Sequence, residues 1–94
     1  MPYFIYILLS KKDNGLYVGC STNVDERIKS HNYGKVVSTV NRRPLIVIYK
    51  ESFDNKADAF NRERILKSLW GAREKKKILK EYINKVEHNS DFFG

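Results

Sequence analysis

The segment that follows Asn23 carries an arginine and a histidine four positions apart, Arg27 and His31. Positions i and i+4 of a helix lie on one face, so a helix here would bring the two side chains together. A guanidinium holds anionic oxygens through several hydrogen bonds, and an imidazole transfers protons near neutral pH. The pair therefore suits chemistry on a phosphodiester. The alternative interpretation is a solvated helix face without a catalytic role.

A carboxylate, Glu63, has an unusual position in the segment KADAFNRERILKSLWG. If this segment is a helix with residues about 100° apart, Glu63 falls between Phe60 and Trp70, inside the apolar sector. Burial of a charged carboxylate is costly unless a cation compensates it. We therefore expect Glu63 either to pair with Arg27 or a nearby lysine, which is a structural role, or to hold a metal ion. Arg62 lies at the edge of the same sector, where its stem would pack and its charged head would stay in water.

The metal that one carboxylate suits is Mg²⁺, which keeps most of its waters and takes one or two protein carboxylates together with substrate phosphate oxygens. A Zn²⁺ site is not expected. Zn²⁺ needs clustered histidines and cysteines, whereas His31 and His88 are far apart in the sequence and Cys20 is the single cysteine.

Two tyrosines, Tyr6 and Tyr17, lie in segments that are expected to pair as strands, and both side chains would then project to the same side. A tyrosine accepts a proton at neutral pH only with help from neighbouring cations or a metal-bound water, because its ordinary pKa is about 10. Each tyrosine by itself also fits a packing role. Gly19 lies within the second strand, where glycine often marks the close approach of another backbone or a ligand.

The strands that would position these side chains are predicted over residues 4–10 and 16–20, joined by a turn at Asn14-Gly15, and over residues 45–49 with an extension toward Phe53. Asn-Gly is a strong hairpin signal because both residues tolerate positive φ. The first strand is apolar nearly throughout, which predicts a central position with both faces covered.

Three helices are predicted. Asn23 caps the first, with Glu26 three residues later, and this helix runs to about His31. The second covers residues 56–70, capped by Asp54 or Asn55, and its apolar side comprises Ala59, Leu66 and Trp70, flanked by Leu69 and Phe60. Gly71 ends it, and the third helix runs from residue 72 or 73 to about 86 with an apolar stripe of Ile78, Leu79, Tyr82, Ile83 and Val86. The tail, residues 87–94, is expected to fray or to dock through Phe92 or Phe93.

The order β-β-α-β-α-α predicts an α+β fold, a small three-stranded antiparallel sheet flanked by three helices. The 94 residues are expected to form one domain, with the core over about residues 3–86.

The chain has 18 lysines and arginines against 11 acidic residues, a net charge of +7. This charge favours a phosphate backbone as partner, although anionic membrane surfaces and ribosomal RNA would benefit equally from charge alone. A single cysteine excludes an internal disulfide and suits a reducing cytoplasm, and the apolar run over residues 4–9 is too short to span a bilayer. We expect a cytoplasmic protein without membrane insertion.

Taken together, these residues resemble the GIY-YIG nuclease family. Phe4-Ile5-Tyr6 stands at the position of the first triplet of the family and Tyr17-Val18-Gly19 at that of the second, about ten residues later. Arg27, His31 and Glu63 match its helical arginine, its histidine or tyrosine, and its metal-binding glutamate. The resemblance covers roughly residues 3–80 and is strongest to small stand-alone domains related to the catalytic domain of an excinuclease.

The resemblance implies phosphodiester hydrolysis that depends on Mg²⁺ or Mn²⁺. Tyr17 would accept a proton from the attacking water, and Tyr6 would hydrogen-bond near the scissile phosphate or support Tyr17. Arg27 would stabilise charge on the phosphate, His31 would relay a proton, and Glu63 would hold the metal. Gly19 would leave room for the phosphate.

Three features depart from the family pattern. Phe4 replaces the glycine of the first triplet. Cys20 replaces a lysine that contacts phosphate in the excinuclease relatives, and Lys35, Arg42 or Arg43 would supply the missing cation. The segment 73–80 has no counterpart of an asparagine that several members carry after the metal-binding helix.

We expect an endonuclease that acts on DNA in repair or recombination, as a monomer, with specificity that depends on DNA structure or on a protein partner. The alternative is a non-catalytic nucleic-acid-binding module on the same fold. A third interpretation is an interaction domain that works through the third helix and the Phe92-Phe93 tail. Glu63 separates the first two, because a carboxylate that faces phosphate would weaken a pure binding site.

Overall fold

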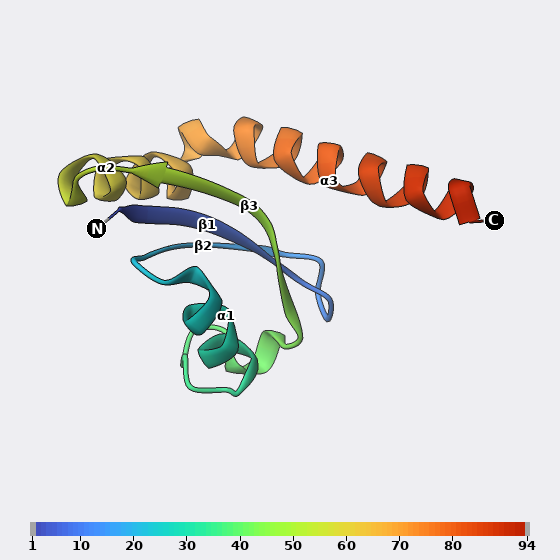
Figure 1. The fold of residues 1–94 in the computed structure, drawn as a ribbon, viewed down its shortest axis with the longest axis horizontal. Helices are drawn as coiled ribbons and strands as arrows, with labels where there is room; N and C mark the ends of the chain where they lie inside the picture. Colours follow the sequence, from blue (N-terminus) through green and yellow to red (C-terminus); the bar gives the residue numbers. More distant parts are fainter. Residues whose placement is uncertain (1, 94) are drawn as a thin grey trace.

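The computed structural model describes the backbone of residues 2–93 and the side chains of residues 2–87. Strands β1 (Tyr3–Ser10), β2 (Leu16–Ser21) and β3 (Leu45–Phe53) form one antiparallel sheet in the order β2-β1-β3 (Figure 1). The apolar β1 is therefore the central strand, as predicted. The element order β-β-α-β-α-α and the α+β class are confirmed as well.

The turn between β1 and β2 is set by Asn14 and Gly15. Asn14 adopts a φ of 61°, a left-handed conformation that asparagine tolerates well. Its amide donates to the carbonyl of Ser10 at 2.9 Å, and the Ser10 amide donates to the carbonyl of Gly15 at 2.9 Å. This turn fixes the register in which Tyr6 lies opposite Gly19.

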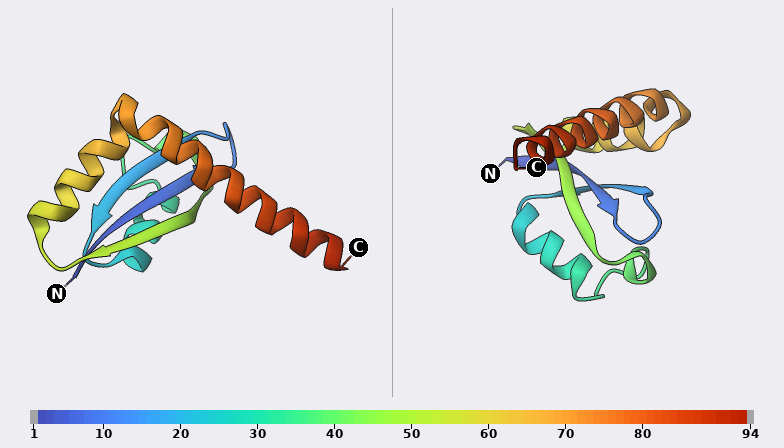
Figure 2. Two further views of the ribbon diagram at one scale, coloured as in Figure 1. Left: turned by 90° about the horizontal axis from the view of Figure 1, so that it is seen from above. Right: turned by 90° about the vertical axis from the view of Figure 1, so that its right-hand side faces the viewer.

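The helices lie on both faces of the sheet. Helix α1 (Val24–Asn32) covers one face, and α2 (Lys56–Lys67) and α3 (Ala72–Phe93) cover the other (Figure 1). Seen from above in Figure 2, the corner between α2 and α3 lies on the β2 side of the sheet, and α3 then crosses toward β3. The edge of β2 is thus bordered by α1 on one face and by α2 on the other.

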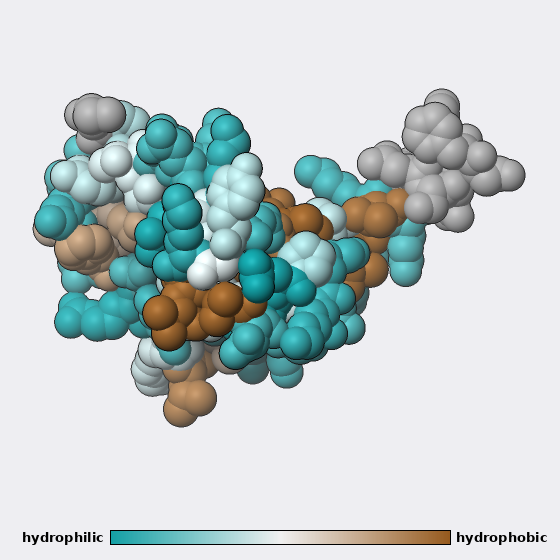
Figure 3. Space-filling view, turned by 90° about the horizontal axis from the view of Figure 1, so that it is seen from below, coloured by the Kyte–Doolittle hydropathy of each residue, from teal (hydrophilic) through white to brown (hydrophobic). Residues whose placement is uncertain are grey.

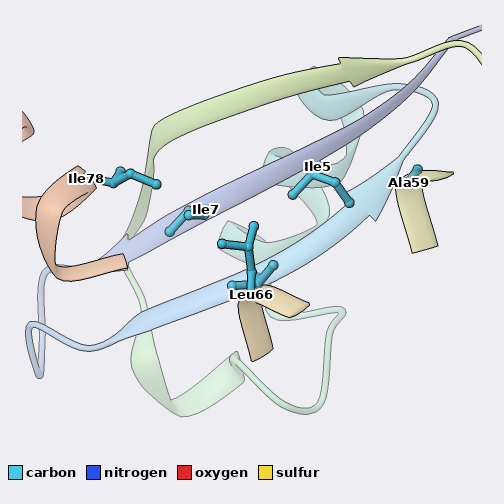
Figure 4. Packing of buried hydrophobic residues seen from close by; sticks show 6 residues of the cluster. Ile5, Ile7, Ala59, Leu66 and Ile78 are labelled. Atoms are coloured by element: carbon cyan, nitrogen blue, oxygen red, sulfur yellow. The ribbon is translucent and has the colours of Figure 1, made fainter. Parts of the chain in front are cut away.

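Side chains of β1 alternate between the two faces and divide the core into two clusters. Ile5 and Ile7 point toward α2 and α3, where they pack against Ala59, Leu66 and Ile78 (Figure 4). Tyr6 and Leu8 point the other way and pack with Val24 and Leu45. Each fully buried aliphatic side chain contributes about 1.5–3 kcal/mol, so the central strand anchors both layers.

Both ends of α1 are fixed by hydrogen bonds. The Asn23 side chain accepts from the amide of Glu26 at 3.1 Å, which confirms the predicted cap. At the other end, Gly34 has a φ of 81°, its amide donates to His31 at 3.1 Å, and the Lys35 amide donates to Ser30 at 3.0 Å. This is the pattern of a Schellman cap. It holds the last turn of α1, which carries His31, in place.

Helix α2 is shorter than predicted. It begins after the Asn55 cap but ends at Lys67, and a short 3-10 helix, Leu69–Gly71, follows. The prediction that Leu69 and Trp70 belong to the apolar side is therefore wrong: they are 93% and 90% exposed. Phe60, predicted on the same side, is also about half exposed.

The cause is local packing at Gly71. A Cβ atom there would lie 2.5 Å from the Ile65 carbonyl oxygen and from the Leu66 Cα, so only glycine allows this approach. Ser68, with extended backbone, breaks the helix before the turn. Gly71 thus separates α2 from α3, as predicted, by fitting against the end of α2.

Helix α3 is longer than predicted, running to Phe93 instead of residue 86. Its apolar stripe is only partly covered there: Ile83 is 42% and Val86 44% exposed, and Figure 3 shows hydrophobic surface on this part of α3. The predicted docking of Phe92 or Phe93 concerns side chains outside the described ones. One further element was not predicted, a 3-10 turn at Val40–Arg42.

Arg62 also differs from expectation, since its head group is paired rather than solvated. Its Nε donates to Glu51 of β3 at 2.7 Å, and its guanidinium also pairs with Glu74 of α3. This network lowers the pKa of Glu74 and raises that of Arg62. Arg62 therefore joins α2 to the edge strand and to the next helix.

The division of the 94 residues into a single domain, with its core over about residues 3–86, stays a prediction. Within the part that the structure describes, no helix has both the length and the apolar character needed to cross a bilayer.

Candidate active site

Three polar side chains form a buried chain of hydrogen bonds on the α1 side of the sheet. The Tyr6 hydroxyl lies 3.1 Å from Nε2 of His31, and Nδ1 of His31 lies 2.7 Å from the Thr39 hydroxyl. Tyr6 is 1% exposed and the other two are fully buried. His31 comes from the capped last turn of α1 and Tyr6 from the central strand, so both positions are rigid.

Burial determines the charge state of this chain. The pKa of His31 is lowered, first by burial and then by the positive charge of Arg27. The pKa of Tyr6 is raised, mainly by burial, with Arg27 acting in the opposite direction. At neutral pH the imidazole and the phenol are therefore uncharged. A neutral imidazole has one donor and one acceptor nitrogen. His31 therefore donates a hydrogen bond to one of the two hydroxyl groups and accepts one from the other.

Tyr17 lies beside this chain on the neighbouring strand. Its ring meets that of His31 edge-to-face, with 5.0 Å between centroids, and the Tyr6 ring meets the same imidazole at 6.0 Å. The prediction that both tyrosines project to the same side is confirmed. Tyr17 is half-buried and reaches the surface, whereas Tyr6 does not.

Gly19 makes this arrangement possible. A Cβ atom at this position would overlap the Tyr6 ring. The space that the sequence interpretation left for a phosphate is therefore filled by Tyr6, because the register places Gly19 directly opposite Tyr6. The missing side chain at Gly19 lets the phenol lie flat across β2 and reach His31.

Glu63 approaches from α2, around the edge of β2. Its Oε2 lies 3.2 Å from Nζ of Lys67, one turn later on the same helix, and its side chain is 22% exposed. The same Nζ lies 6.0 Å from the centroid of the Tyr17 ring. The pairing with a lysine, one of the two expected partners of Glu63, is thus present, and Lys67 bridges the carboxylate and the tyrosine.

Arg27 and Cys20 complete the surroundings. Arg27 is exposed on α1, and its charge acts on both Tyr6 and His31. The pKa of the Cys20 thiol is raised by burial and by the negative charge of Glu63, so Cys20 is an uncharged neighbour of the carboxylate. The site therefore has a buried layer of Tyr6, His31 and Thr39 and a surface layer of Tyr17, Arg27, Glu63 and Lys67.

The donor set limits which metal fits. Among the residues that the structure describes, no group of three or more histidine, cysteine or acidic side chains gathers in one place. A single carboxylate fits Mg²⁺ or Mn²⁺, which would retain water and take phosphate oxygens from a substrate, and it does not fit Zn²⁺. The Lys67 ammonium now pairs with that carboxylate, so it would have to turn toward the phosphate when Glu63 holds a metal.

The other predicted phosphate-binding cations do not gather at this site. Arg42 pairs with Asp13 of the hairpin turn at 3.0 Å, and this pair lowers the pKa of Asp13 to about 2. Arg43 donates to the Val40 carbonyl at 2.7 Å, and Lys35 lies exposed after α1. The Ser10 hydroxyl donates to the Arg42 carbonyl, which puts the Arg42 backbone four residues, about 13 Å, along β1 from Tyr6.

Two residues of the site were not predicted from the sequence. Lys67 carried a usable signal, because it is four positions after Glu63 and ion pairs form at that helical spacing. Thr39 carried none, because it lies in an irregular loop whose path determines what it contacts.

Comparison with known proteins gives a consistent result. Residues 2–78 match the GIY-YIG catalytic domain. A UPF0213 protein of Staphylococcus haemolyticus is 40% identical over 80 residues, which is 84% of this chain and 95% of that protein. A UPF0213 protein of Natronomonas pharaonis is 35% identical over 80 residues, 84% of this chain and 93% of its own.

A solved structure is similar as well. The solution NMR structure of a UPF0213 protein from Bacillus halodurans superimposes with a TM-score of 0.53 at 34% identity, covering 85% of this chain and 84% of that one.

Proposed function

This chain belongs to the GIY-YIG catalytic-domain family, and from that membership we propose that it is a metal-dependent endonuclease that hydrolyses phosphodiester bonds in DNA. The observation that supports the proposal most strongly is the meeting of Tyr17, Lys67 and Glu63 at the β2 edge. Tyr17 comes from β2, whereas Glu63 and Lys67 come from α2, and the Tyr17 ring also meets the ring of the buried His31.

The surface layer would carry out the chemistry. In this mechanism Tyr17 first releases its own proton to solvent and acts as the phenolate. A water oxygen then attacks the phosphorus while its proton passes to the phenolate oxygen of Tyr17, and the bond from phosphorus to the leaving deoxyribose oxygen breaks. The leaving oxygen takes a proton from solvent. Arg27 and Lys67 would hold the phosphate oxygens on which charge develops.

The metal would be held by Glu63. When bound, a divalent ion supplies positive charge to the phosphate oxygens and makes its bound water a better proton donor.

The buried layer would orient the surface layer. The imidazole of His31 contacts both tyrosine rings, and its nitrogens connect to Tyr6 and Thr39. Full burial of His31 means that it acts through Tyr6 and Tyr17 rather than on the substrate. Its predicted role as a proton relay stays a prediction, because in this mechanism His31 orients Tyr6 and Tyr17 through its hydrogen bonds and ring contacts.

Charge and the family match support a nucleic-acid substrate. A net charge of +7 favours a phosphate backbone. We propose that this backbone belongs to DNA, and that recognition depends on DNA structure or on a protein partner, in cytoplasmic repair or recombination. Cleavage by a monomer is the simplest arrangement.

The experiment is a cleavage assay on supercoiled plasmid, single-stranded DNA, RNA and branched DNA. Each substrate is incubated with Mg²⁺, with Mn²⁺ and with chelator. We expect cleavage of at least one DNA substrate with metal and none with chelator. Arg27→Ala should reduce the rate about 100-fold or more, because it removes a donor to the developing charge.

Lys29→Ala is the matched control, since Lys29 is an exposed cation on the same helix outside the proposed site. It should cleave at the wild-type rate. Metal-dependent cleavage that is equally strong in Arg27→Ala would point to a contaminating nuclease and contradict the proposal.

The alternative function, a nucleic-acid-binding module without turnover, has one specific observation in its favour. Glu63 is paired with Lys67, and a carboxylate neutralised in this way repels phosphate less than a free one. Binding without cleavage on every substrate and with both metals would favour this alternative.

A further inference from the structure

The turn between α2 and α3 presents two large apolar side chains to solvent. Leu69 is 93% exposed and Trp70 is 90% exposed. Tryptophan has the largest apolar surface of any side chain, and an uncovered one is unusual on a protein of this size. The pair, which we call the Leu69-Trp70 tip, is therefore free to contact a ligand.

The tip is held outward by a tightly packed base. Leu66 and Gly71, on either side of it, are both buried. The Ser68 hydroxyl donates to the Ile65 carbonyl at 2.6 Å, and the Gly71 amide donates to the Ser68 carbonyl at 3.1 Å. Exposure of the tip is thus a consequence of ordered packing beneath it.

Positive charge surrounds the tip. Residues 62–80 contain eight basic and two acidic residues, so they carry +6 of the net charge of +7. Arg64 and Lys67 precede the tip, and Arg73 and the run Lys75–Lys77 follow it. An apolar protein surface would be poorly matched by so many cations, whereas an exposed aromatic ring among cations is the arrangement that binds bases and phosphates together.

The tip is also close to the proposed site. Lys67, which pairs with Glu63 and lies over the Tyr17 ring, is three residues before Trp70. Consecutive Cα atoms are about 3.8 Å apart, so the two Cα atoms are separated by at most about 11 Å. This distance corresponds to about three stacked nucleotides at about 3.4 Å each.

From these observations we propose that the Leu69-Trp70 tip binds an unstacked base of the nucleic acid, close to the phosphate at the β2 edge. In a duplex the faces of the bases are covered by their neighbours, and only the edges are open in the grooves. A single strand, bulge or gap exposes base faces on which an indole stacks, whatever the sequence. The inference rests on the proposed function and gives it a substrate class, DNA with unpaired bases.

The experiment uses the single tryptophan of the chain as its own probe. The full-length protein, in chelator, is titrated with a 20-nucleotide single strand, the matching duplex, and that duplex with a three-nucleotide bulge. Binding is followed by Trp70 emission and, in parallel, by anisotropy of labelled DNA. We expect the single strand and the bulged duplex to quench Trp70 and the intact duplex to leave its emission nearly unchanged.

Substitution at the tip tests the same point without the probe. Trp70→Ala should weaken single-strand binding about tenfold in the anisotropy assay while duplex binding stays unchanged, and Trp70→Phe should restore most of the loss. Phe60→Ala is the matched control, because Phe60 is a half-exposed aromatic on α2 away from the tip, and it should bind like wild type.

Four results would overturn the inference. The first is single-strand binding that leaves Trp70 emission unchanged. The second is an unchanged preference of Trp70→Ala for single strands. The third is wild-type protein that is oligomeric in solution while Trp70→Ala is monomeric, because the tip would then be a self-association contact. The fourth is no binding of any oligonucleotide. Because these measurements are made in chelator, they are independent of cleavage. The proposal that the tip binds a base can therefore be wrong while the protein still cleaves DNA with metal, and it can be right while the protein does not cleave DNA.

Discussion

His31 lies at the centre of the buried hydrogen bonds of the candidate site. It is fully buried, contacts two tyrosine rings, and uses both ring nitrogens on hydroxyl groups. Because burial lowers its pKa, protonation of His31 would place an uncompensated positive charge beneath the sheet. The site therefore depends on a neutral imidazole.

The stability of the protein should consequently depend on pH near neutrality. In the unfolded chain His31 takes up a proton below its ordinary pKa of about 6.5, whereas in the folded chain it resists protonation. The unfolded state then binds more protons, so the free energy of unfolding should fall as pH is lowered from 6.5. Urea unfolding at pH 8, 6.5 and 5.5 measures this. His31→Gln should have a flatter pH dependence, and an unchanged one would show that other groups cause it.

Tyr17 should be the more reactive of the two tyrosines, since Tyr6 is enclosed and Tyr17 reaches solvent beside Lys67. Tyr17→Phe removes one oxygen and keeps the ring that packs on His31. We expect cleavage to fall by about 100-fold or more, with little change in thermal stability. Tyr33→Phe, on an exposed tyrosine, should leave the rate unchanged. Cleavage by Tyr17→Phe at the wild-type rate would remove Tyr17 from the proposed mechanism.

At the scale of elements, helix α2 carries two residues of the candidate site and is also paired with β3 and α3. One side of it carries Glu63 and Lys67 to the β2 edge, and Arg62 ties it to Glu51 of β3 and Glu74 of α3. The position of the carboxylate over β2 thus depends on an ion-pair network elsewhere on the same helix.

Loss of Arg62 should therefore be costly. Arg62→Ala leaves the Glu51 and Glu74 carboxylates without their shared cation, and we expect the free energy of unfolding to fall by about 2 kcal/mol. Arg64→Ala, an exposed arginine on the same helix, should change it by less than about 0.5 kcal/mol. Urea unfolding of the two variants gives the comparison. Equal stabilities would show that the network contributes nothing measurable.

The elements were predictable where local signals agree with packing. Asn23 and Asn55 cap their helices as the sequence indicates, and the apolar β1 is central. The end of α2 at Lys67 was not predictable, because helical periodicity continues through Leu69 and Trp70, whereas the extended backbone of Ser68 and the close packing of Gly71 on Leu66 end the helix earlier.

The site itself was predictable in part. Strand pairing predicted that Tyr6 and Tyr17 share one side of the sheet, whereas His31 was grouped with them only through the family resemblance. Their contact with Thr39 depends on the path of a loop without periodicity, and the filling of the space at Gly19 depends on the register of β1 against β2.

At the scale of the whole molecule, charge is distributed unevenly. The segment 62–80 holds +6 of the net +7, at the corner of the fold between α2 and α3. The sheet edge that carries Tyr17 lies on the side of this corner (Figure 2). A nucleic acid drawn to the basic segment would therefore arrive at the β2 edge.

Binding of single-stranded DNA should be strongly dependent on salt for this reason. Each phosphate contact contributes about −0.7 to the slope of log K against log salt concentration. Replacing Lys75, Lys76 and Lys77 by glutamine should make the slope less steep by about 2, whereas Lys11→Gln, at the hairpin turn, should not change it. A slope unaffected by the triple substitution would place the DNA elsewhere on the molecule.

The proposed catalytic function is tested most directly by the Mg²⁺ dependence of DNA cleavage in Glu63→Gln. This variant keeps the size of the side chain but loses the charge that would hold a metal and that now pairs with Lys67. Glu81→Gln, on an exposed part of α3, is the control. We predict that Glu63→Gln cleaves DNA at least about 100-fold more slowly than wild type. It should bind DNA as tightly as wild type or more tightly. Cleavage at the wild-type rate by Glu63→Gln in Mg²⁺ would contradict the account.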